Sequence, residues 1–163
     1  VSDENGLVSP ANFNSPVQVV ISGNKDYVEK ASNIAKEEGA KRVVPLDVSA
    51  PFHCALMHTA ANRLKEVLDT VEFSEINYPI VTNVEAKPNV DASTVNDLLV
   101  KQMTSPVRWT DTINYLNRMG VDHFLEIGPS NVLCGLIKRT IKDINSSNIE
   151  KVEQLNHIKE NGI

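Results

Sequence analysis

His53 stands in the stretch VSAPFHCALM, residues 48–57, directly after a proline and a phenylalanine and between two apolar runs. The pattern before it predicts a strand and the pattern after it predicts a helix, so His53 is expected at a strand-to-helix corner. Catalytic groups of α/β folds lie at the carboxyl ends of strands, where an imidazole can act as a general base. A structural histidine hydrogen-bonded to a carbonyl fits the same pattern. This stretch alone leaves both interpretations open.

A second candidate is Ser130, in the stretch GPSNV at residues 128–132, between another predicted strand and helix. The stretch imitates the nucleophile elbow G-x-S-x-G, but a valine replaces the final glycine that keeps such a turn tight. Ser130 or a neighbour is equally suited to accept an amide N–H at the start of the helix. A serine hydrolase that uses Ser130 and His53 is therefore only a weak alternative.

The remaining cysteines and histidines show no metal-site spacing, and no acidic residue accompanies them in a ligand pattern. They are Cys54, Cys134, His58, His123 and His157. Cys54 is predicted to be a small buried residue rather than a partner of the adjacent histidine. No glycine-rich phosphate loop is present. The sequence therefore predicts no metal site and no bound cofactor.

The composition is that of one globular domain. The chain has 163 residues and 18.0 kDa, with 41% apolar and 23% charged residues and a net charge of −5. This charge gives no support to nucleic-acid binding, and no run approaches the ~20 apolar residues that span a bilayer. Two thiols are too few for a disulfide framework, so a cytoplasmic location is expected. Because the chain does not begin with methionine, we expect it to be a piece of a longer protein.

Strands and helices alternate along the chain, which predicts an α/β fold with a largely parallel sheet. The predicted strands are 7–13, 17–22, 41–48, 76–84 and 121–127. The predicted helices are 26–38, 57–71, 93–103, 109–119 and 132–141, with caps at Asn24, Gly39 and either Asp91 or Ser93. The pair Ser147 and Glu150 has capping-box spacing and predicts a further short helix. The changed rhythm after residue 48 predicts a subdomain boundary near Ser49.

Five strings in this order together resemble one family, the malonyl-CoA:acyl carrier protein transacylases of fatty-acid synthesis. They are ANFNSPVQVVISG (11–23), GAKRVVPLDVSAPFHCALM (39–57), VTNVEAKP (81–88), KQMTSPVRWTDTINYL (101–116) and GVDHFLEIGPSNVLCGLIKRT (120–140). The resemblance implies an α/β-hydrolase-like acyltransferase subdomain and a small ferredoxin-like subdomain, both incomplete in this chain. Residues 1–48 would be the carboxy-terminal part of the small subdomain. Residues 49–163 would be the carboxy-terminal part of the catalytic one.

The resemblance also implies an activity, in which malonyl passes from coenzyme A through a seryl ester to the phosphopantetheine thiol of acyl carrier protein. It assigns His53 as the catalytic base, the backbone carbonyl of Gln102 as the group that orients it, and Phe52 as the residue that excludes a methyl-branched unit. A core aromatic is the alternative role for Phe52. The substrates carry the phosphopantetheine, so no further cofactor is implied.

The chain departs from the family pattern in several ways. The nucleophile elbow G-H-S-x-G, the carboxylate-binding arginine and the glutamine-containing oxyanion segment are absent from this sequence. The expected partners are therefore the missing amino-terminal half, malonyl-CoA and an acidic acyl carrier protein. Ser130 occupies a position where the family has glycine, and Arg108 is not expected to clamp malonate. The basic residues that could attract the carrier protein are Lys138, Arg139 and Lys142, although a run of charges on a helix is more often a solvated face. For the whole chain, the main alternative is a non-catalytic fragment or interaction module of the same fold.

Overall fold

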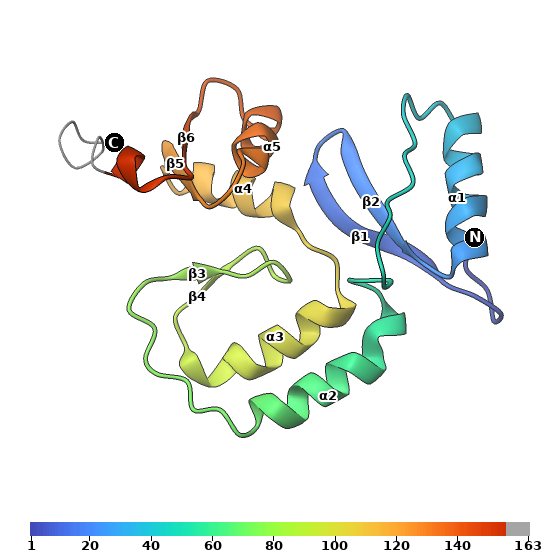
Figure 1. Ribbon diagram of the computed structural model, residues 1–163, viewed down its shortest axis with the longest axis horizontal. Coiled ribbons are helices and arrows are strands. Elements are labelled where there is room, and N and C mark those ends of the chain that lie inside the picture. Colours follow the sequence, from blue (N-terminus) through green and yellow to red (C-terminus); the bar gives the residue numbers. More distant parts are fainter. Residues whose placement is uncertain (156–163) are drawn as a thin grey trace.

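The computed structural model describes residues 1–155. Strands β1 (Val8–Ser15) and β2 (Gln18–Gly23) form an antiparallel hairpin, and helix α1 (Lys25–Glu37) packs against it (Figure 1). The predicted caps of α1 are confirmed in position, since Asn24 is its N-cap and Gly39 follows its end with φ 94°. The Asn24 side chain does not cap the helix, because its Oδ1 accepts the Leu7 N–H at 2.9 Å.

The predicted strand over residues 41–48 is wrong, because this segment pairs with no strand in the described part of the chain. Val44, Leu46 and Val48 are 51%, 59% and 61% exposed. A strand is stabilised by hydrogen bonds to a neighbour, and Pro45 removes one of the donors. Residues 41–48 therefore have the alternating apolar pattern of a strand, but no neighbouring strand of the described residues pairs with them.

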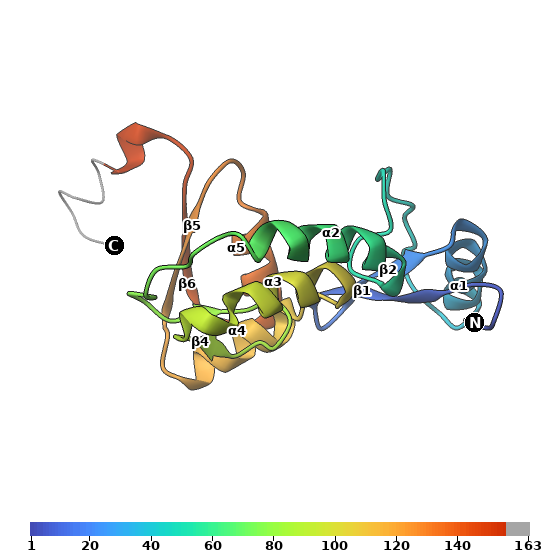
Figure 2. The same cartoon turned by 90° about the horizontal axis from the view of Figure 1, so that it is seen from below.

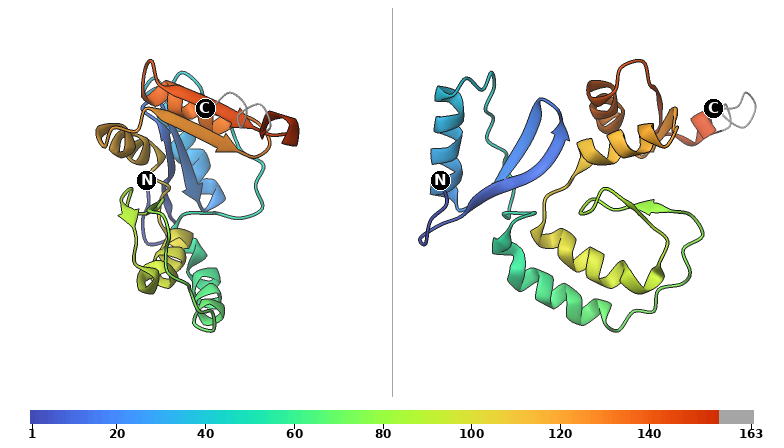
Figure 3. Two further views of the ribbon diagram at one scale, coloured as in Figure 1. Left: turned by 90° about the vertical axis from the view of Figure 1, so that its left-hand side faces the viewer. Right: turned by 180° about the vertical axis from the view of Figure 1, so that it is seen from behind.

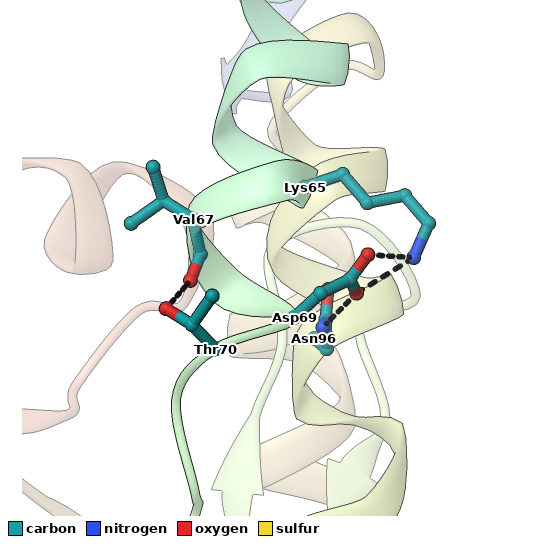
Figure 4. Close-up of polar contacts among 5 residues, drawn as sticks. All are labelled: Lys65, Val67, Asp69, Thr70 and Asn96. Carbon is teal, nitrogen blue, oxygen red and sulfur yellow. Dashed lines mark hydrogen bonds and ion pairs between the residues drawn. The ribbon is translucent and has the colours of Figure 1, made fainter.

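The next region is a pair of helices that lie side by side in both Figure 1 and Figure 2. The elements are the 3₁₀ turn η1 (Ala55–Met57), helix α2 (His58–Leu68), the 3₁₀ turn η2 (Ala92–Thr94) and helix α3 (Val95–Thr104). Asp91 is the N-cap of η2 and accepts the Ser93 N–H, as one of the two predicted caps. At the far end of the pair, Asp69 accepts hydrogen bonds from Lys65 and Asn96, which ties α2 to α3 (Figure 4). The Lys65 ammonium, and after it the Asn96 amide, lowers the pKa of Asp69.

Between these helices the chain forms only a short antiparallel pair, β3 (Ile80–Val81) with β4 (Pro88–Asn89). The predicted strand over 76–84 is therefore mostly wrong. The chain turns back within residues 82–87, where the Thr82 N–H donates to the Lys87 carbonyl at 3.1 Å. This turn limits the ladder to two residues on each side.

The last region holds helix α4 (Trp109–Arg118), strand β5 (His123–Ile127), helix α5 (Val132–Thr140) and strand β6 (Asn145–Ile149). Strands β5 and β6 run parallel, which Figure 3 shows as two adjacent arrows. This is the one parallel pair among the three described sheets, so the prediction of a largely parallel sheet is wrong, although the α/β class is confirmed. The predicted capping box of Ser147 and Glu150 is also wrong, since pairing with β5 makes Ser147 part of a strand. A short helical turn does follow, over residues 152–155.

Strand β1 is joined to the start of α4. The Val107 N–H donates to the Ala11 carbonyl at 2.8 Å, and the Phe13 N–H donates to the Val107 carbonyl at 2.9 Å. The Thr110 hydroxyl donates to the Phe13 carbonyl. The amino-terminal hairpin therefore packs on residues that follow the predicted subdomain boundary near Ser49, and that boundary stays a prediction.

The core is small for a chain of this length. The accessible surface is 11413 Å². A folded monomer of 18.0 kDa is expected to expose about 8,000 Å². The excess includes large apolar side chains such as Ile127, which is 75% exposed at the end of β5. Much apolar surface is thus left uncovered in this structure.

Candidate active site

The candidate base lies on a tight corner between the extended segment 41–48 and η1. The Phe52 N–H donates to the Ala50 carbonyl at 3.0 Å, and the Met57 N–H donates to the Cys54 carbonyl at 3.0 Å. Between these two turns His53 has φ 61°, in the left-handed region. Histidine is one of the non-glycine residues that enter this region more readily. The corner is therefore formed as predicted, except that a loop and not a strand leads into it.

The imidazole is fixed by helix α3. Nδ1 of His53 lies 3.0 Å from the carbonyl oxygen of Gln102. A carbonyl only accepts, so Nδ1 carries the proton, and Nε2 of the neutral ring is left with a lone pair. This is the pairing that the family resemblance implies for these two residues.

The sequence explains why that carbonyl is free. Within a helix the Gln102 carbonyl would accept an N–H from residue 106, but residue 106 is proline and has no N–H. The last carbonyls of a helix lack intrahelical partners and carry its partial negative charge. The final turn of α3 thus orients the ring.

The two neighbours of His53 differ in exposure. Cys54 is 1% exposed, and its thiol donates to the Pro51 carbonyl at 3.1 Å, which confirms its predicted role as a small buried residue. Phe52 is 47% exposed, so its ring is not enclosed by the described residues. It stands beside the base on the surface, and its role in selecting the acyl group stays a prediction.

Ser130 lies on a second corner, between β5 and α5, with φ 74°. Its hydroxyl makes no hydrogen bond within residues 1–155, while its backbone carbonyl accepts the Asn148 amide. The same amide donates to the carbonyls of Glu126 and Gly128. Hydrogen bonds from Asn148 thus fix the backbone of this corner, and no described histidine is hydrogen-bonded to the Ser130 hydroxyl.

The start of α5 is capped by a carboxylate that sequence reasoning missed. The Glu126 side chain accepts the N–H groups of Leu133 at 3.1 Å and Cys134 at 2.8 Å, whereas the N-cap residue Asn131 makes no side-chain bond. Burial pushes the pKa of Glu126 up, but the two N–H donors outweigh it and leave the pKa lowered. The Cys134 thiol has a raised pKa because of burial and of the nearby Glu126.

The remaining candidates have structural partners. Arg108 binds the Asp111 carboxylate at 2.8 Å, and the prediction that it is no malonate clamp stays a prediction. His123 Nε2 lies 3.1 Å from the Ser147 hydroxyl, across the β5–β6 pair. His157 lies outside the described residues.

Within residues 1–155 no three His, Cys, Asp or Glu side chains gather closely enough to hold a metal ion. No helix of that part of the chain has the length and apolar character needed to cross a membrane. Two open hollows of about 350 and 550 Å³ lie over the β3–β4 turn, one against α3 and the other against α4. His53 lines neither of these two hollows.

The model of the family described as "Acyl transferase domain" matches residues 3–162, and the chain belongs to this family. Among curated relatives, the malonyl CoA-acyl carrier protein transacylase of Salmonella typhimurium is 47% identical over 146 residues, covering 90% of this chain and 47% of the relative. The enzyme of the same name from Bacillus subtilis is 46% identical over 156 residues, covering 94% and 49%.

Solved structures give the same result. The acyl carrier protein S-malonyltransferase of Vibrio cholerae matches with a TM-score of 0.91 and 43% identity, covering 95% of this chain and 51% of that one. A malonyl-transacylase solved in complex with its type II PKS acyl-carrier protein also matches with a TM-score of 0.91 and 43% identity, covering 97% and 52%. The resemblance found in the sequence is thus confirmed. The chain spans about half the length of the relatives that it matches.

Proposed function

We propose that this chain takes part in malonyl transfer from coenzyme A to acyl carrier protein and that His53 is the general base. The observation that carries the proposal is the 3.0 Å contact from His53 Nδ1 to the Gln102 carbonyl, on a chain whose relatives are named for this transfer. That contact places the ring proton on Nδ1 and leaves Nε2 able to accept another proton. A helix-terminal carbonyl thereby does what a carboxylate does in many serine enzymes.

The proposed reaction has two halves. Nε2 of His53 accepts the proton of a serine hydroxyl while the serine oxygen attacks the malonyl thioester carbon, and the carbon–sulfur bond then breaks. The proton passes from the imidazolium to the coenzyme A thiolate, which leaves as a thiol. In the second half His53 accepts the proton of the phosphopantetheine thiol, and the thiolate attacks the seryl ester carbon. The bond from that carbon to the serine oxygen then breaks, and the imidazolium returns its proton to the serine oxygen.

The serine comes from a segment outside this sequence. The sequence contains no G-H-S-x-G elbow, and Ser130 makes no contact with a histidine in the described residues. A two-stranded parallel pair such as β5–β6 is stable only when it is extended and covered on both faces, yet Ile127 on β5 is 75% exposed. We propose that the missing amino-terminal half of the same enzyme covers this surface and brings the nucleophile to His53.

The acceptor in this proposal is an acidic acyl carrier protein. The basic side chains Lys138 and Arg139 near the end of α5, and Lys142 beyond it, are exposed. Opposite charges on two proteins speed their encounter and orient them. A structural neighbour of this chain is a transacylase in complex with its acyl-carrier protein. A cytoplasmic site of action remains part of the proposal.

A chimera tests this function. This chain replaces the region that it matches in the Salmonella typhimurium relative, and transfer of malonyl from malonyl-CoA to acyl carrier protein is measured. We expect the chimera to transfer malonyl and the His53→Ala chimera to lose about 10²–10⁴-fold in rate. A folded chimera without transfer, or a His53→Ala chimera with the parental rate, would overturn the proposal.

The isolated 163-residue chain provides the complementary test. After incubation with malonyl-CoA, mass spectrometry should find no covalent malonyl adduct, because the chain holds no activated hydroxyl. A stable adduct on Ser130 would instead support a hydrolase-like reaction of Ser130 with His53. A chain that folds but never restores transfer in the chimera would support the non-catalytic module.

A further inference from the structure

Gln102 makes a second contact that the proposed mechanism does not use. Its backbone carbonyl accepts from His53, and its side-chain Oε1 accepts the Asn83 amide Nδ2 at 3.0 Å. Asn83 and Gln102 are both half-buried and come from different elements, the β3–β4 turn and helix α3. The three residues therefore form one chain of hydrogen bonds, from Asn83 through Gln102 to the imidazole.

The turn that carries Asn83 is itself well fixed. The Ala86 N–H donates to the Thr82 carbonyl at 2.9 Å, which closes the turn around Asn83. The Asn83 carbonyl accepts the Arg108 N–H at 2.9 Å, just before α4 begins. Asn83 thus joins the turn, the end of α3 and the beginning of α4.

The end of α3 needs such a contact. Pro106 deprives Gln102 of its intrahelical partner, and terminal turns of helices fray when their polar groups are unsatisfied. A frayed turn would aim the Gln102 carbonyl in varying directions. The proton on Nδ1 would then lose the acceptor that keeps it there.

We propose that Asn83 is a positioning residue for the general base: its amide holds Gln102, and so keeps the His53 proton on Nδ1 and Nε2 free. This inference rests on the proposed function for its catalytic consequence. The positioning itself concerns only residues of this chain.

The first test reads the His53 tautomer directly in the 163-residue chain. Long-range ¹H–¹⁵N spectra are recorded at about pH 9, well above the ordinary range of imidazole titration. We expect the parent to hold the Nδ1–H form, and Asn83→Leu and Gln102→Met to shift the ring toward the Nε2–H form. Gln102→Glu keeps an oxygen for Asn83 and should retain the parental tautomer. Asn117→Leu, at an exposed asparagine of α4 without a side-chain bond in the described residues, is the matched control.

The second test is kinetic and uses the chimera. Misplacement of a catalytic group by about 1 Å costs up to about 10²-fold in rate, so we expect Asn83→Leu to lower kcat by about tenfold. KM for malonyl-CoA should change by less than about twofold, and the control variant Asn117→Leu should keep the parental kcat.

An unchanged His53 tautomer in folded Asn83→Leu and Gln102→Met would overturn the positioning role. Gln102→Met breaks the same bond from the helix side, so it decides the question even where Asn83→Leu does not fold. A tautomer shift in the chain together with an inactive parental chimera would instead uphold the positioning and reject the proposed function.

Discussion

The corners at His53 and Ser130 look alike in the backbone and differ in what they hold. Each places a non-glycine residue in the left-handed region, at φ 61° and φ 74°, just before a helical segment begins. At the first corner a side chain is held, because Nδ1 of His53 reaches a carbonyl 49 residues away in the sequence. At the second corner only the backbone is held, by the Asn148 amide.

The difference suggests a criterion for interpreting a strained backbone residue, namely whether the contacts that offset the strain orient a reactive side chain or only hold the backbone. A left-handed residue costs roughly 1–2 kcal/mol, which other contacts must offset. At His53 the offset comes from a contact that fixes a proton on one ring nitrogen. At Ser130 it comes from contacts of Asn148 and Glu126 that close a loop and cap a helix. Our proposal therefore places a catalytic group at the His53 corner and none at the Ser130 corner.

The largest expected effect separates the two corners by activity. In the chimera, His53→Ala should lower malonyl transfer by about 10²–10⁴-fold, whereas Ser130→Ala should leave it within about twofold. The reason is that the Ser130 hydroxyl has no partner in the described residues. Steady-state assays with equal melting temperatures make the comparison. Equal losses of transfer rate from the two substitutions would show that both corners take part in the reaction, which would contradict the comparison.

A second effect concerns Phe52, beside the base. Its ring should occupy the space where the methyl of methylmalonyl would lie, and one methyl group is worth about 1–3 kcal/mol in such a site. The chimera should thus prefer malonyl-CoA over methylmalonyl-CoA by tens to a few hundred fold. Phe52→Ser should narrow the ratio mainly by improving the branched substrate. The same product ratio from both proteins in a competition assay would reduce Phe52 to a packing role.

A third effect concerns the pH dependence of stability at the Ser130 corner. The folded pKa of Glu126 lies below its ordinary value of 4.5. The contribution of Glu126 to the free energy of unfolding is therefore fully present above pH 4.5. It is lost as the pH falls through the lower pKa of the folded state. Glu126→Gln should cost about 1 kcal/mol in the free energy of unfolding near neutral pH, as for the loss of a helix cap.

Urea unfolding of the chain between about pH 3 and pH 7 measures this effect. The Glu126→Gln variant should lose less stability in acid than the parent does. Glu72→Gln, at an exposed glutamate without a hydrogen bond in the described residues, should keep the parental pH dependence. If the stability of Glu126→Gln depends on pH in the same way as that of the parent, the Glu126 carboxylate does not stabilise this corner.

The smallest effect tests the strain itself. Ser130→Gly relieves a left-handed residue but adds freedom to the unfolded chain, by about 0.4–1 kcal/mol. The net expectation is a gain of about 0.5 kcal/mol in the free energy of unfolding, with unchanged transfer by the chimera. The same unfolding titration measures it. A loss above about 1 kcal/mol would mean that the serine side chain stabilises the corner after all.

Local signals in the sequence located the helices and the two corners. The cap at Asn24, the glycine after α1 and the cap at Asp91 each depend on a few neighbouring residues, and all three are found at their predicted positions. The strands were harder to predict because pairing depends on distant partners. Residues 41–48 have strand periodicity without a partner, whereas residues 145–149 lack it and pair with β5.

The same limit applies to the site. His53 stood out through its local context, and Gln102 entered only through the family resemblance. Asn83 and Glu126 were missed, because an asparagine in a turn and a glutamate in a strand carry no local signal of what they bind. For Gln102 one signal was present, since a proline four residues after it leaves its carbonyl without a helical partner.

Chemical rescue tests the central claim most directly, namely that an imidazole at residue 53 moves the proton. In the chimera, His53→Gly leaves a space beside Gln102 and a residue that adopts φ 61° without strain. We predict that added imidazole raises malonyl transfer by this variant at least about tenfold, in a saturable way, and leaves the parent unchanged. A His53→Gly chimera with parental melting temperature and malonyl-CoA affinity that imidazole fails to reactivate at any concentration would contradict the account.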